Sequence, residues 1–391
     1  SSRTSKAANW YGPNHCPHSR GIRGTKRPDR YASPAKYMTQ ESPTFSRPAL
    51  ADAVFDPEPI NPLPVSDSVE VWSDQRHQIL AAWQNVIGQP DFARGDVDAS
   101  ADHVGSFEQQ DYTADIYRQP TTPNSRQTIL VMTPKRPLGA TCPGMVVPFY
   151  DPDRMVGLDL ATQTSLPDRV TVTEFGRHVA GMGFIVVCPE VYPFNTVEEP
   201  TDSSGMNWWQ AAADQLQIDH PHWTGVGRLA WDASRALDLL LQQPGIDATR
   251  CGIIGHSLGG KIAFYAAALD TRFSLCISSD FGIGFSFTNW DDDWYLGDRI
   301  HAPGFARAHH ELLALIAPRP FFLVGGEADR PASWHYIQEA QRVYSLYGRQ
   351  DAAGFFHHGA GHRPTPEAMQ IAYAWLADQF GITLETGSLQ L

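Results

Sequence analysis

Long apolar runs and an excess of positive charge are both missing from this 391-residue sequence. No apolar stretch approaches the roughly 18 residues that a membrane-spanning helix needs. Lys and Arg number 30 against 43 Asp and Glu, a formal net charge of −13. That balance disfavours binding to nucleic acid or to an anionic membrane surface. We therefore expect neither nucleic acid nor a membrane as a partner, and the sequence leaves the oligomeric state open.

Cysteine is scarce, and no pair has the spacing of a metal knuckle. The five cysteines include no C-x-x-C pair, so neither a zinc site nor a disulfide scaffold is indicated. Cys188, Cys251 and Cys276 lie in apolar stretches and are expected to be small buried hydrophobes. The pairs at 309–310 and 357–358 are histidines without a carboxylate or cysteine at ligand spacing. We therefore predict no metal and no other cofactor.

The apolar content is sufficient for a packed core, with 42% hydrophobic and 11% aromatic residues. Residues 1–48 differ from the rest, because nine Lys/Arg face two Asp/Glu in a stretch rich in Pro, Gly and Ser. A basic arm for nucleic acid is one interpretation, but the remainder carries −20. We expect residues 1–64 to be a disordered or extended tail and strap. The stretch lacks the apolar core of a secretory signal, which predicts a cytoplasmic protein.

Residues 65–391 are predicted to form one catalytic domain in which strands alternate with helices. Ser66-Asp67 can cap a first helix that Gly88 ends. Further helices are expected at 172–182, 225–242, 257–269, 333–346 and 365–380. Strands are expected at 112–117, 127–133, 145–150, 184–188, 251–254, 273–278, 320–324 and 354–357. The later strands are short and continuously apolar, which indicates a mostly parallel α/β sheet covered by helices on both faces.

A nucleophile motif follows one of these strands. Gly255-His256-Ser257-Leu258-Gly259 has the form G-x-S-x-G, directly after an apolar strand and before an Ala-rich helix. A serine in such a sharp turn needs glycine on both sides for the backbone to close. The helix that follows directs its N-terminus at the site and favours developing negative charge. The alternative is a glycine-rich turn with an incidental serine.

A nucleophilic serine needs a base, and the base needs an orienting acid. His362 lies in a Gly-rich loop after the last strand, 105 residues beyond Ser257. Three carboxylates compete for the acid: Glu327 and Asp329 after the strand 320–324, and Asp280 after the strand 273–278. We favour Asp329, because the intervening glycines give the chain room to turn toward the histidine loop. The alternatives are that Asp329 is an ordinary carboxylate of a surface loop and that His362 is a solvated imidazole of a loop.

These segments resemble the α/β-hydrolase superfamily, and within it the dienelactone-hydrolase-like and acetyl-xylan-esterase-like serine hydrolases. The matching stretches are Gly255–Lys261, Ile316–Gly326, Gly359–His362, His220–Gly225 and Trp231-Asp232. The resemblance covers about residues 66–380 and implies an α/β-hydrolase fold with Ser257 as nucleophile, His362 as general base and Asp329 as orienting acid. Dienelactone hydrolases use a cysteine nucleophile, so Ser257 favours ordinary esters as substrates.

The oxyanion hole is expected to use the backbone N–H of Leu258 and a second one from the loop after the strand 145–150. Tyr150 is our candidate for the second donor. Many relatives carry His-Gly at this loop, where this sequence has Pro148-Phe149-Tyr150-Asp151. The alternative is that Tyr150 only packs or lines the pocket.

Two aromatic segments are expected as insertions near 195–223 and 280–310. They contribute the candidate pocket residues Trp208, Trp209, Trp290 and Trp294. Tryptophan beside Asp and Asn could stack on and hydrogen-bond a sugar ring, although hydrophobic lid packing is the alternative. Neither segment has the long Leu/Ile/Val run that a fatty-acyl channel needs.

Together these features predict a serine carboxylic-ester hydrolase that acts through an acyl-enzyme on short-acyl esters, with acetylated carbohydrate as a candidate substrate. A peptidase or amidase of the same fold is one alternative, disfavoured because residues 1–100 are too short for a propeller domain. A non-catalytic binding protein is the other, and nothing in a scaffold would require serine, acid and histidine together.

Overall fold

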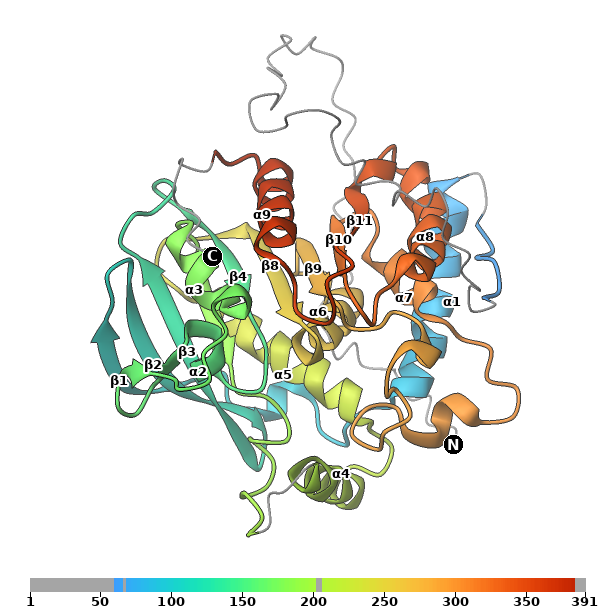
Figure 1. The fold of residues 1–391 in the computed structure, drawn as a ribbon. Helices are drawn as coiled ribbons and strands as arrows, with labels where there is room; N and C mark the ends of the chain where they lie inside the picture. The colour runs from blue at the N-terminus through green and yellow to red at the C-terminus, as the bar shows by residue number, and fades with distance from the viewer. Residues whose placement is uncertain (1–59, 66–67, 202–205, 384–391) are drawn as a thin grey trace.

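A nine-stranded sheet forms the centre of the protein in this computed structural model, which describes residues 60–65, 68–201 and 206–383. The strand order is β1-β2-β3-β7-β4-β8-β9-β10-β11 (Figure 1). The bounds are β1 Asp102–Glu108, β2 Tyr112–Thr122, β3 Ser125–Pro134, β4 Cys142–Val146, β7 Ile185–Pro189, β8 Ile246–His256, β9 Leu275–Ser279, β10 Phe321–Gly325 and β11 Ala353–His357. Strands β1, β2, β3 and β7 pair antiparallel, and every pair from β7 to β11 is parallel. The expected mostly parallel sheet is confirmed.

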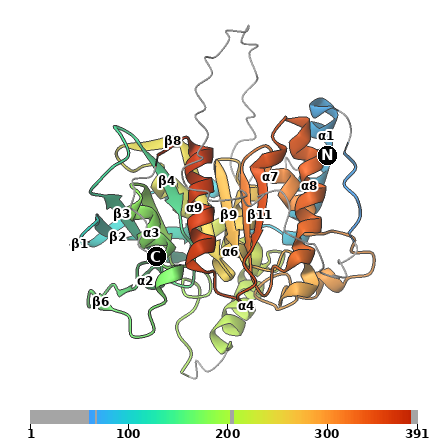
Figure 2. The ribbon, with the colours of Figure 1, turned by 45° about the horizontal axis from the view of Figure 1, so that its top comes forward.

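Helices cover both faces of this sheet (Figures 1 and 2). One face carries α1 Val69–Ile87, α5 Gly225–Leu240, α6 Leu258–Leu269, α7 His309–Ile316 and α8 Trp334–Leu346. The other face carries α2 Pro152–Val156, α3 Phe175–Gly181 and α9 Pro366–Phe380. Helix α4, Asn207–Asp219, packs into the first core at the lower rim in Figure 1. A small separate ribbon pairs β5 Leu158–Asp159 with β6 Thr164–Ser165.

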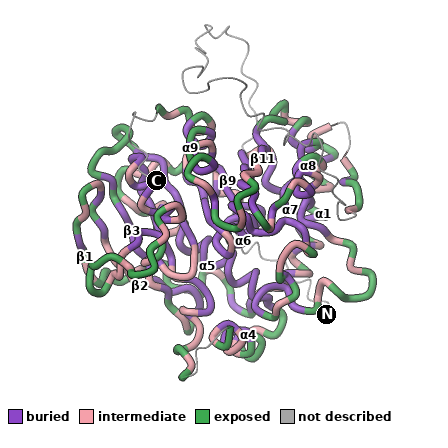
Figure 3. The backbone as a smooth tube through the Cα atoms, in the orientation of Figure 1, coloured by how far each residue is buried: buried purple, intermediate pink, exposed green. Residues whose placement is uncertain are grey.

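Side-chain alternation along the strands separates these two cores. On β3, Ile129 and Val131 belong to the core under α5 and α6, whereas Leu130 and Met132 belong to the core under α3 and α9. Both sets are buried, which explains why such strands are continuously apolar in sequence. Helix α6 is buried along its whole length and lies in the middle of the molecule (Figure 3). The Ser257 turn at its start is therefore carried by a fully buried helix.

Most expected elements are present with shifted ends. The first helix starts at Val69 with Ser68 as its cap, one residue after the predicted pair, and Gly88 ends it at φ +75°. The sequence interpretation missed β1, α4 and α7, together with the short elements α2, β5 and β6. The three cysteines of apolar stretches, Cys188, Cys251 and Cys276, are buried and free as expected.

The structure describes only the last part of the predicted tail and strap. Residues 60–65 form neither helix nor strand, and the backbone of Leu63 contacts α8 through Glu339 and Arg342. The rest of the predicted tail, 1–59, lies outside the described residues. Within the described ranges, no helix is long and apolar enough to cross a membrane.

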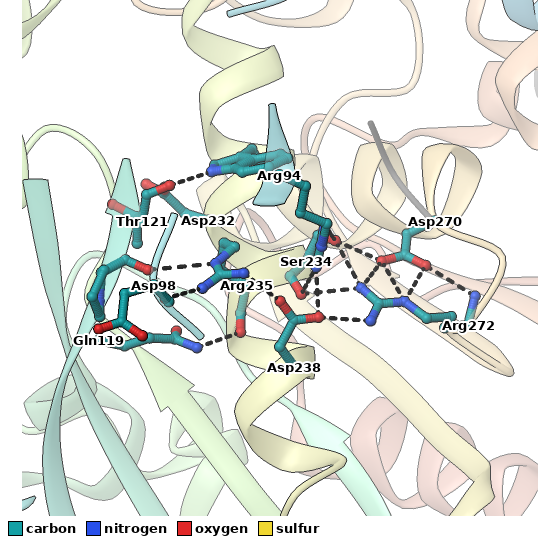
Figure 4. Close-up of polar contacts among 12 residues, drawn as sticks. Arg94, Asp98, Gln119, Thr121, Asp232, Ser234, Arg235, Asp238, Asp270 and Arg272 are labelled. Carbon is teal, nitrogen blue, oxygen red and sulfur yellow. Dashed lines mark hydrogen bonds and ion pairs between the residues drawn. The ribbon is translucent and has the colours of Figure 1, made fainter. Parts of the chain in front are cut away.

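A buried polar network along α5 fixes the position of that helix (Figure 4). Asp238 accepts hydrogen bonds from Arg94, Arg235 and Arg272, which come from three different parts of the fold. One turn earlier, Ser234 donates to the buried carboxylate of Asp270 at 2.6 Å. These contacts tie α5 to the segment before β1 and to the turn between α6 and β9.

The Arg228–Asp232 ion pair lies deeper on the same helix. Their side chains are 3% and 0% exposed and 2.8 Å apart. Asp232 also accepts from the side chain of Asn195 at 2.7 Å and from the backbone N–H of Tyr192 at 3.3 Å. This carboxylate therefore anchors the start of the insertion near 195–223 to the core.

Replacing Asp232 with Ala should lower the free energy of unfolding by about 3–5 kcal/mol, because Arg228 would stay buried without its counter-ion. Urea unfolding followed by circular dichroism measures this difference. Asp102→Ala is the matched control, since its pair with Arg126 is largely exposed and should be worth less than about 1 kcal/mol. Equal losses in the two variants would contradict the anchoring role of Asp232.

Candidate active site

Ser257 occupies a strained turn between β8 and α6. Its φ is +53°, in the left-handed region that non-glycine residues rarely adopt. A Cβ on Gly255 would collide with the carbonyl of Gly259, and a Cβ on Gly259 would collide with the carbonyl of Pro148. Both glycines of the motif are therefore needed for steric reasons. The Ser257 N–H donates to the Ser279 carbonyl at 2.7 Å, which ties the turn to the end of β9.

His362 joins this serine to a buried carboxylate. Its Nε2 lies 2.8 Å from Ser257 Oγ and its Nδ1 lies 2.7 Å from Asp280 Oδ2. An ionised carboxylate only accepts, so Nδ1 carries the proton and Nε2 is free to accept from the serine hydroxyl. The His362 side chain is 45% exposed, whereas that of Asp280 has no exposed surface. The structure thus brings together a serine hydroxyl, an imidazole and a buried carboxylate in one hydrogen-bonded chain.

The acid in this chain is not the one expected from the sequence. We predicted that Asp329 orients His362, and that prediction is wrong. The Asp329 carboxylate instead accepts from the backbone N–H groups of Gly282 and Ile283. Asp280 directly follows β9 with φ +44°, and its carboxylate reaches the histidine loop. The third candidate, Glu327, is exposed.

The surroundings of the two aspartates shift their pKa values in opposite directions. Burial acts to raise the pKa of Asp280, but hydrogen bonds from His362 and from the backbone of Asp329 and Gly326 hold it below its ordinary value. Burial raises the pKa of Asp329 to about 6, and the negative charge of Asp280 also raises it. Hydrogen bonds from Ile283, Gly282 and Ser333 act in the opposite direction. Asp280 is therefore the more readily ionised of the two carboxylates, and its charge can stabilise an imidazolium.

His256, the residue before the nucleophile, supports the base. Its ring centroid lies 4.8 Å from that of His362, and its Nδ1 lies 3.1 Å from Ser279 Oγ. Burial, followed by the neighbouring His362, lowers the pKa of His256 to about 3, so its ring is neutral near pH 7. The sequence interpretation assigned no role to this residue.

The N-terminus of α6 lies at the Ser257 turn, where the oxyanion hole is predicted. Leu258 is the first helical residue, so its N–H has no acceptor within the helix. The loop after β4 packs directly against this turn, because Gly259 leaves space for the Pro148 carbonyl. The Tyr150 ring is half-buried and makes edge contacts with Phe149 and Trp209. The ring therefore packs as in the alternative interpretation, and the Leu258 and Tyr150 N–H groups as oxyanion donors stay a prediction.

Three of the four predicted pocket tryptophans belong to the core instead. Trp209, Trp290 and Trp294 are 5%, 0% and 8% exposed. Trp209 and Trp294 have centroids 6.3 Å apart, so the two insertions pack against each other. Trp290 donates from Nε1 to the Gly282 carbonyl at 2.7 Å and presents no face for a sugar, which corrects its predicted stacking role. Trp208 is partly exposed, with its Nε1 bonded to the Val197 carbonyl.

Lys261 is an unexpected buried charge one turn after the nucleophile. Its ammonium donates to Thr288 Oγ1 at 2.6 Å and Asn289 Oδ1 at 3.1 Å, and it lies 4.1 Å from the ring centroid of Trp290. Burial lowers the pKa of Lys261 to about 7, although the charges of nearby carboxylates, Asp292 above all, act to raise it. The signal available in sequence was a lysine inside an otherwise apolar, Ala-rich helix.

The four histidines considered for metal binding have other neighbours. His309 lies 2.8 Å from the Tyr265 hydroxyl, His310 bonds the Asn61 carbonyl, and His357 bonds the Gly326 carbonyl. His358 caps the turn by accepting from the Ala360 N–H. The described part of the chain holds no group of three His, Cys, Asp or Glu side chains that could bind a metal ion.

Asp280→Asn should lower kcat on a nitrophenyl ester by roughly 10⁴-fold, because an amide can neither fix the proton on Nδ1 nor stabilise the imidazolium. Steady-state kinetics of the folded variant test this expectation. Glu327→Gln is the matched control from the competing loop and should stay close to wild type. Loss of activity in the Glu327 variant with an active Asp280 variant would contradict the assignment.

Comparison with known proteins gives an independent line of evidence. Residues 222–290, a range that includes Ser257 and Asp280, match a family model described as "Glucuronyl esterase, fungi". The 4-O-methyl-glucuronoyl methylesterase of Hypocrea jecorina is 31% identical over 182 residues, which is 39% of each chain. Carbohydrate esterase MZ0003, from an unknown prokaryotic organism, is 28% identical over 37% of this chain and 39% of its own. Among the similar curated relatives the match spans 25% to 54% of their length.

Solved structures extend the likeness to most of the chain. The glucuronoyl esterase from Solibacter usitatus superposes with a TM-score of 0.60 at 18% identity, covering 89% of this chain and 100% of that one. The structure of a Bacteroides fragilis protein described as a "putative acetyl xylan esterase" gives a TM-score of 0.55 at 14% identity, covering 78% of this chain and 79% of that one. At these identities the likeness establishes the fold. Its sheet order, its strained serine turn and this structural likeness together show that the chain has the α/β-hydrolase fold.

Proposed function

We propose that the protein is a serine carboxylic-ester hydrolase that acts on an ester of a carbohydrate. The hydrogen-bonded chain from Ser257 through His362 to Asp280 carries this proposal. Nothing in a packing role requires a strained serine, an imidazole partly open to solvent and a buried ionised carboxylate in series. This consideration also disfavours a non-catalytic binding protein.

The geometry supports an acyl-enzyme mechanism. Ser257 Oγ attacks the ester carbonyl while His362 Nε2 takes its proton, and Asp280 stabilises the imidazolium that forms. The Leu258 N–H, and that of Tyr150 in our proposal, stabilise the negative charge on the carbonyl oxygen. His362 returns the proton to the departing alcohol, then activates a water that releases the acid. The cycle uses only side chains, backbone groups and water.

For the substrate, we propose an ester of a uronic acid, in which the sugar is the acyl group. The family match over 222–290 and the relatives named 4-O-methyl-glucuronoyl methylesterases support this choice. The exposed side chain of His362, at 45%, is consistent with an ester carried on a bulky carbohydrate. An acetylated carbohydrate, the short-acyl substrate expected from the sequence, is the second candidate, supported by the likeness to an acetyl xylan esterase. The predicted cytoplasmic location and the expected lack of nucleic-acid and membrane partners stay predictions.

Fluorophosphonate labelling tests the serine hydrolase proposal. The wild-type protein should be labelled at Ser257 and should hydrolyse nitrophenyl acetate. Ser257→Ala should lose both the labelling and the hydrolysis while keeping the wild-type circular dichroism spectrum, because the side chain points out of the core. Only the residual catalysis that the oxyanion hole and substrate binding provide would remain. A folded Ser257→Ala variant that keeps a tenth of wild-type turnover would show that another residue is the nucleophile.

An ester panel distinguishes the two substrate classes and the peptidase alternative. We expect kcat/KM on the methyl ester of glucuronic acid to exceed that on acetylated xylose by at least tenfold. Among nitrophenyl esters, acetate should be turned over faster than decanoate, because neither insertion has the long Leu/Ile/Val run that a fatty-acyl channel needs. A preference for acetylated sugar would favour the second candidate, and faster hydrolysis of an anilide than of any ester would favour a peptidase.

A further inference from the structure

Two neighbouring loops exchange hydrogen bonds through a pair of buried aspartates. The loop after β9 carries Asp280, and the loop after β10 carries Asp329. Asp280 Oδ1 accepts from the N–H groups of Gly326 at 2.8 Å and Asp329 at 2.7 Å. Asp329 Oδ2 and Oδ1 accept from Gly282 at 2.8 Å and Ile283 at 2.7 Å. Each carboxylate therefore satisfies backbone donors of the other's loop.

This exchange leaves one oxygen of Asp280 for the imidazole. Oδ1 is occupied by its two backbone donors, so Oδ2 is directed at His362 Nδ1. Oδ2 also accepts a longer hydrogen bond, 3.2 Å, from the Glu327 N–H. Rotation of the carboxylate would break two short hydrogen bonds in a dry environment, where unsatisfied donors are costly.

The loop after β10 also contacts the loop that carries the base. The Glu327 N–H donates to the Gly361 carbonyl at 3.1 Å, next to His362. A Cβ on Gly326 would collide with the same carbonyl. The segment 325–329 thus lies between the acid loop and the base loop and touches both.

We propose that Asp329 is a positioning residue, which holds the 282–283 backbone so that Asp280 Oδ2 stays aligned with His362. The inference rests on the proposed function in one respect, because alignment matters only if His362 acts as a base. Asp329 itself touches neither the imidazole nor the nucleophile. A displacement of about 1 Å in such a chain can lower the rate by roughly 10²-fold.

Asp329→Asn is the direct test, since the amide keeps the volume but offers one accepting oxygen to two N–H donors. We expect kcat on nitrophenyl acetate to fall by about 10- to 100-fold with KM changed less than threefold. Ser333→Ala is the matched control: it removes a 3.0 Å hydrogen bond to the same carboxylate from within the loop after β10. It leaves both bonds to 282–283 in place and should change kcat less than threefold.

An NMR measurement distinguishes a positioning role of Asp329 from a general effect on the stability of the protein. The proton shared by His362 Nδ1 and Asp280 should give a low-field NMR resonance that disappears in Asp280→Asn. In Asp329→Asn it should move upfield or broaden, whereas in Ser333→Ala it should stay in place. A folded Asp329→Asn protein with wild-type kcat and an unchanged resonance would overturn the proposal.

The NMR readout needs no substrate, so it also distinguishes failure of this inference from failure of the proposed function. If the wild-type protein hydrolyses no ester, the function fails, and the resonance still reports whether Asp329 aligns Asp280. Asp329→Ser, which keeps one accepting oxygen in a smaller side chain, provides a second variant if Asp329→Asn does not fold. The same shifted resonance supports the proposal, and an unchanged one contradicts it.

Discussion

The solvation of one buried carboxylate by backbone amides is the interaction on which the site depends. Asp280 has no exposed side-chain surface, so its charge is tolerable only because peptide N–H groups and one imidazole replace water. Those amides come from the neighbouring loop, which the parallel pairing of β9 with β10 brings alongside. The chemistry of Ser257 and His362 is thus tied to the register of the central sheet.

Local sequence signals were enough to predict much of the fold. Continuously apolar runs identified β8, β9 and β10, and the capping serine and the terminal glycine bounded α1 to within a residue or two. The missed elements lack such signals. Strand β1 is an edge strand with mostly exposed residues, and α7 starts in a histidine pair that has no capping side chain. Strand β1 is held by its pairing with the adjacent β2, and α7 by packing into the core that α1, α6 and α8 share.

The residues of the candidate site also differ in whether a local sequence signal identifies them. Ser257 and His362 could be predicted because a motif and a glycine-rich loop identify them locally. The choice between Asp280 and Asp329 depends on which of two adjacent loops turns toward the histidine, and each loop has a carboxylate just past its strand. Burial likewise decided the role of Trp290, since composition cannot distinguish a stacking platform from a core residue whose indole N–H bonds a loop carbonyl.

The exchange of amide donors between the two loops also bears on motion. Loops at the rim of a sheet ordinarily open independently of the core, because water satisfies their amides. In this chain the amides at 282, 283, 326 and 329 are bonded to buried carboxylates, so neither loop can open without breaking hydrogen bonds to the other. Asp280 therefore belongs to the same hydrogen-bonded unit as the ends of β9 and β10, to which its own N–H is also joined through the Val324 carbonyl.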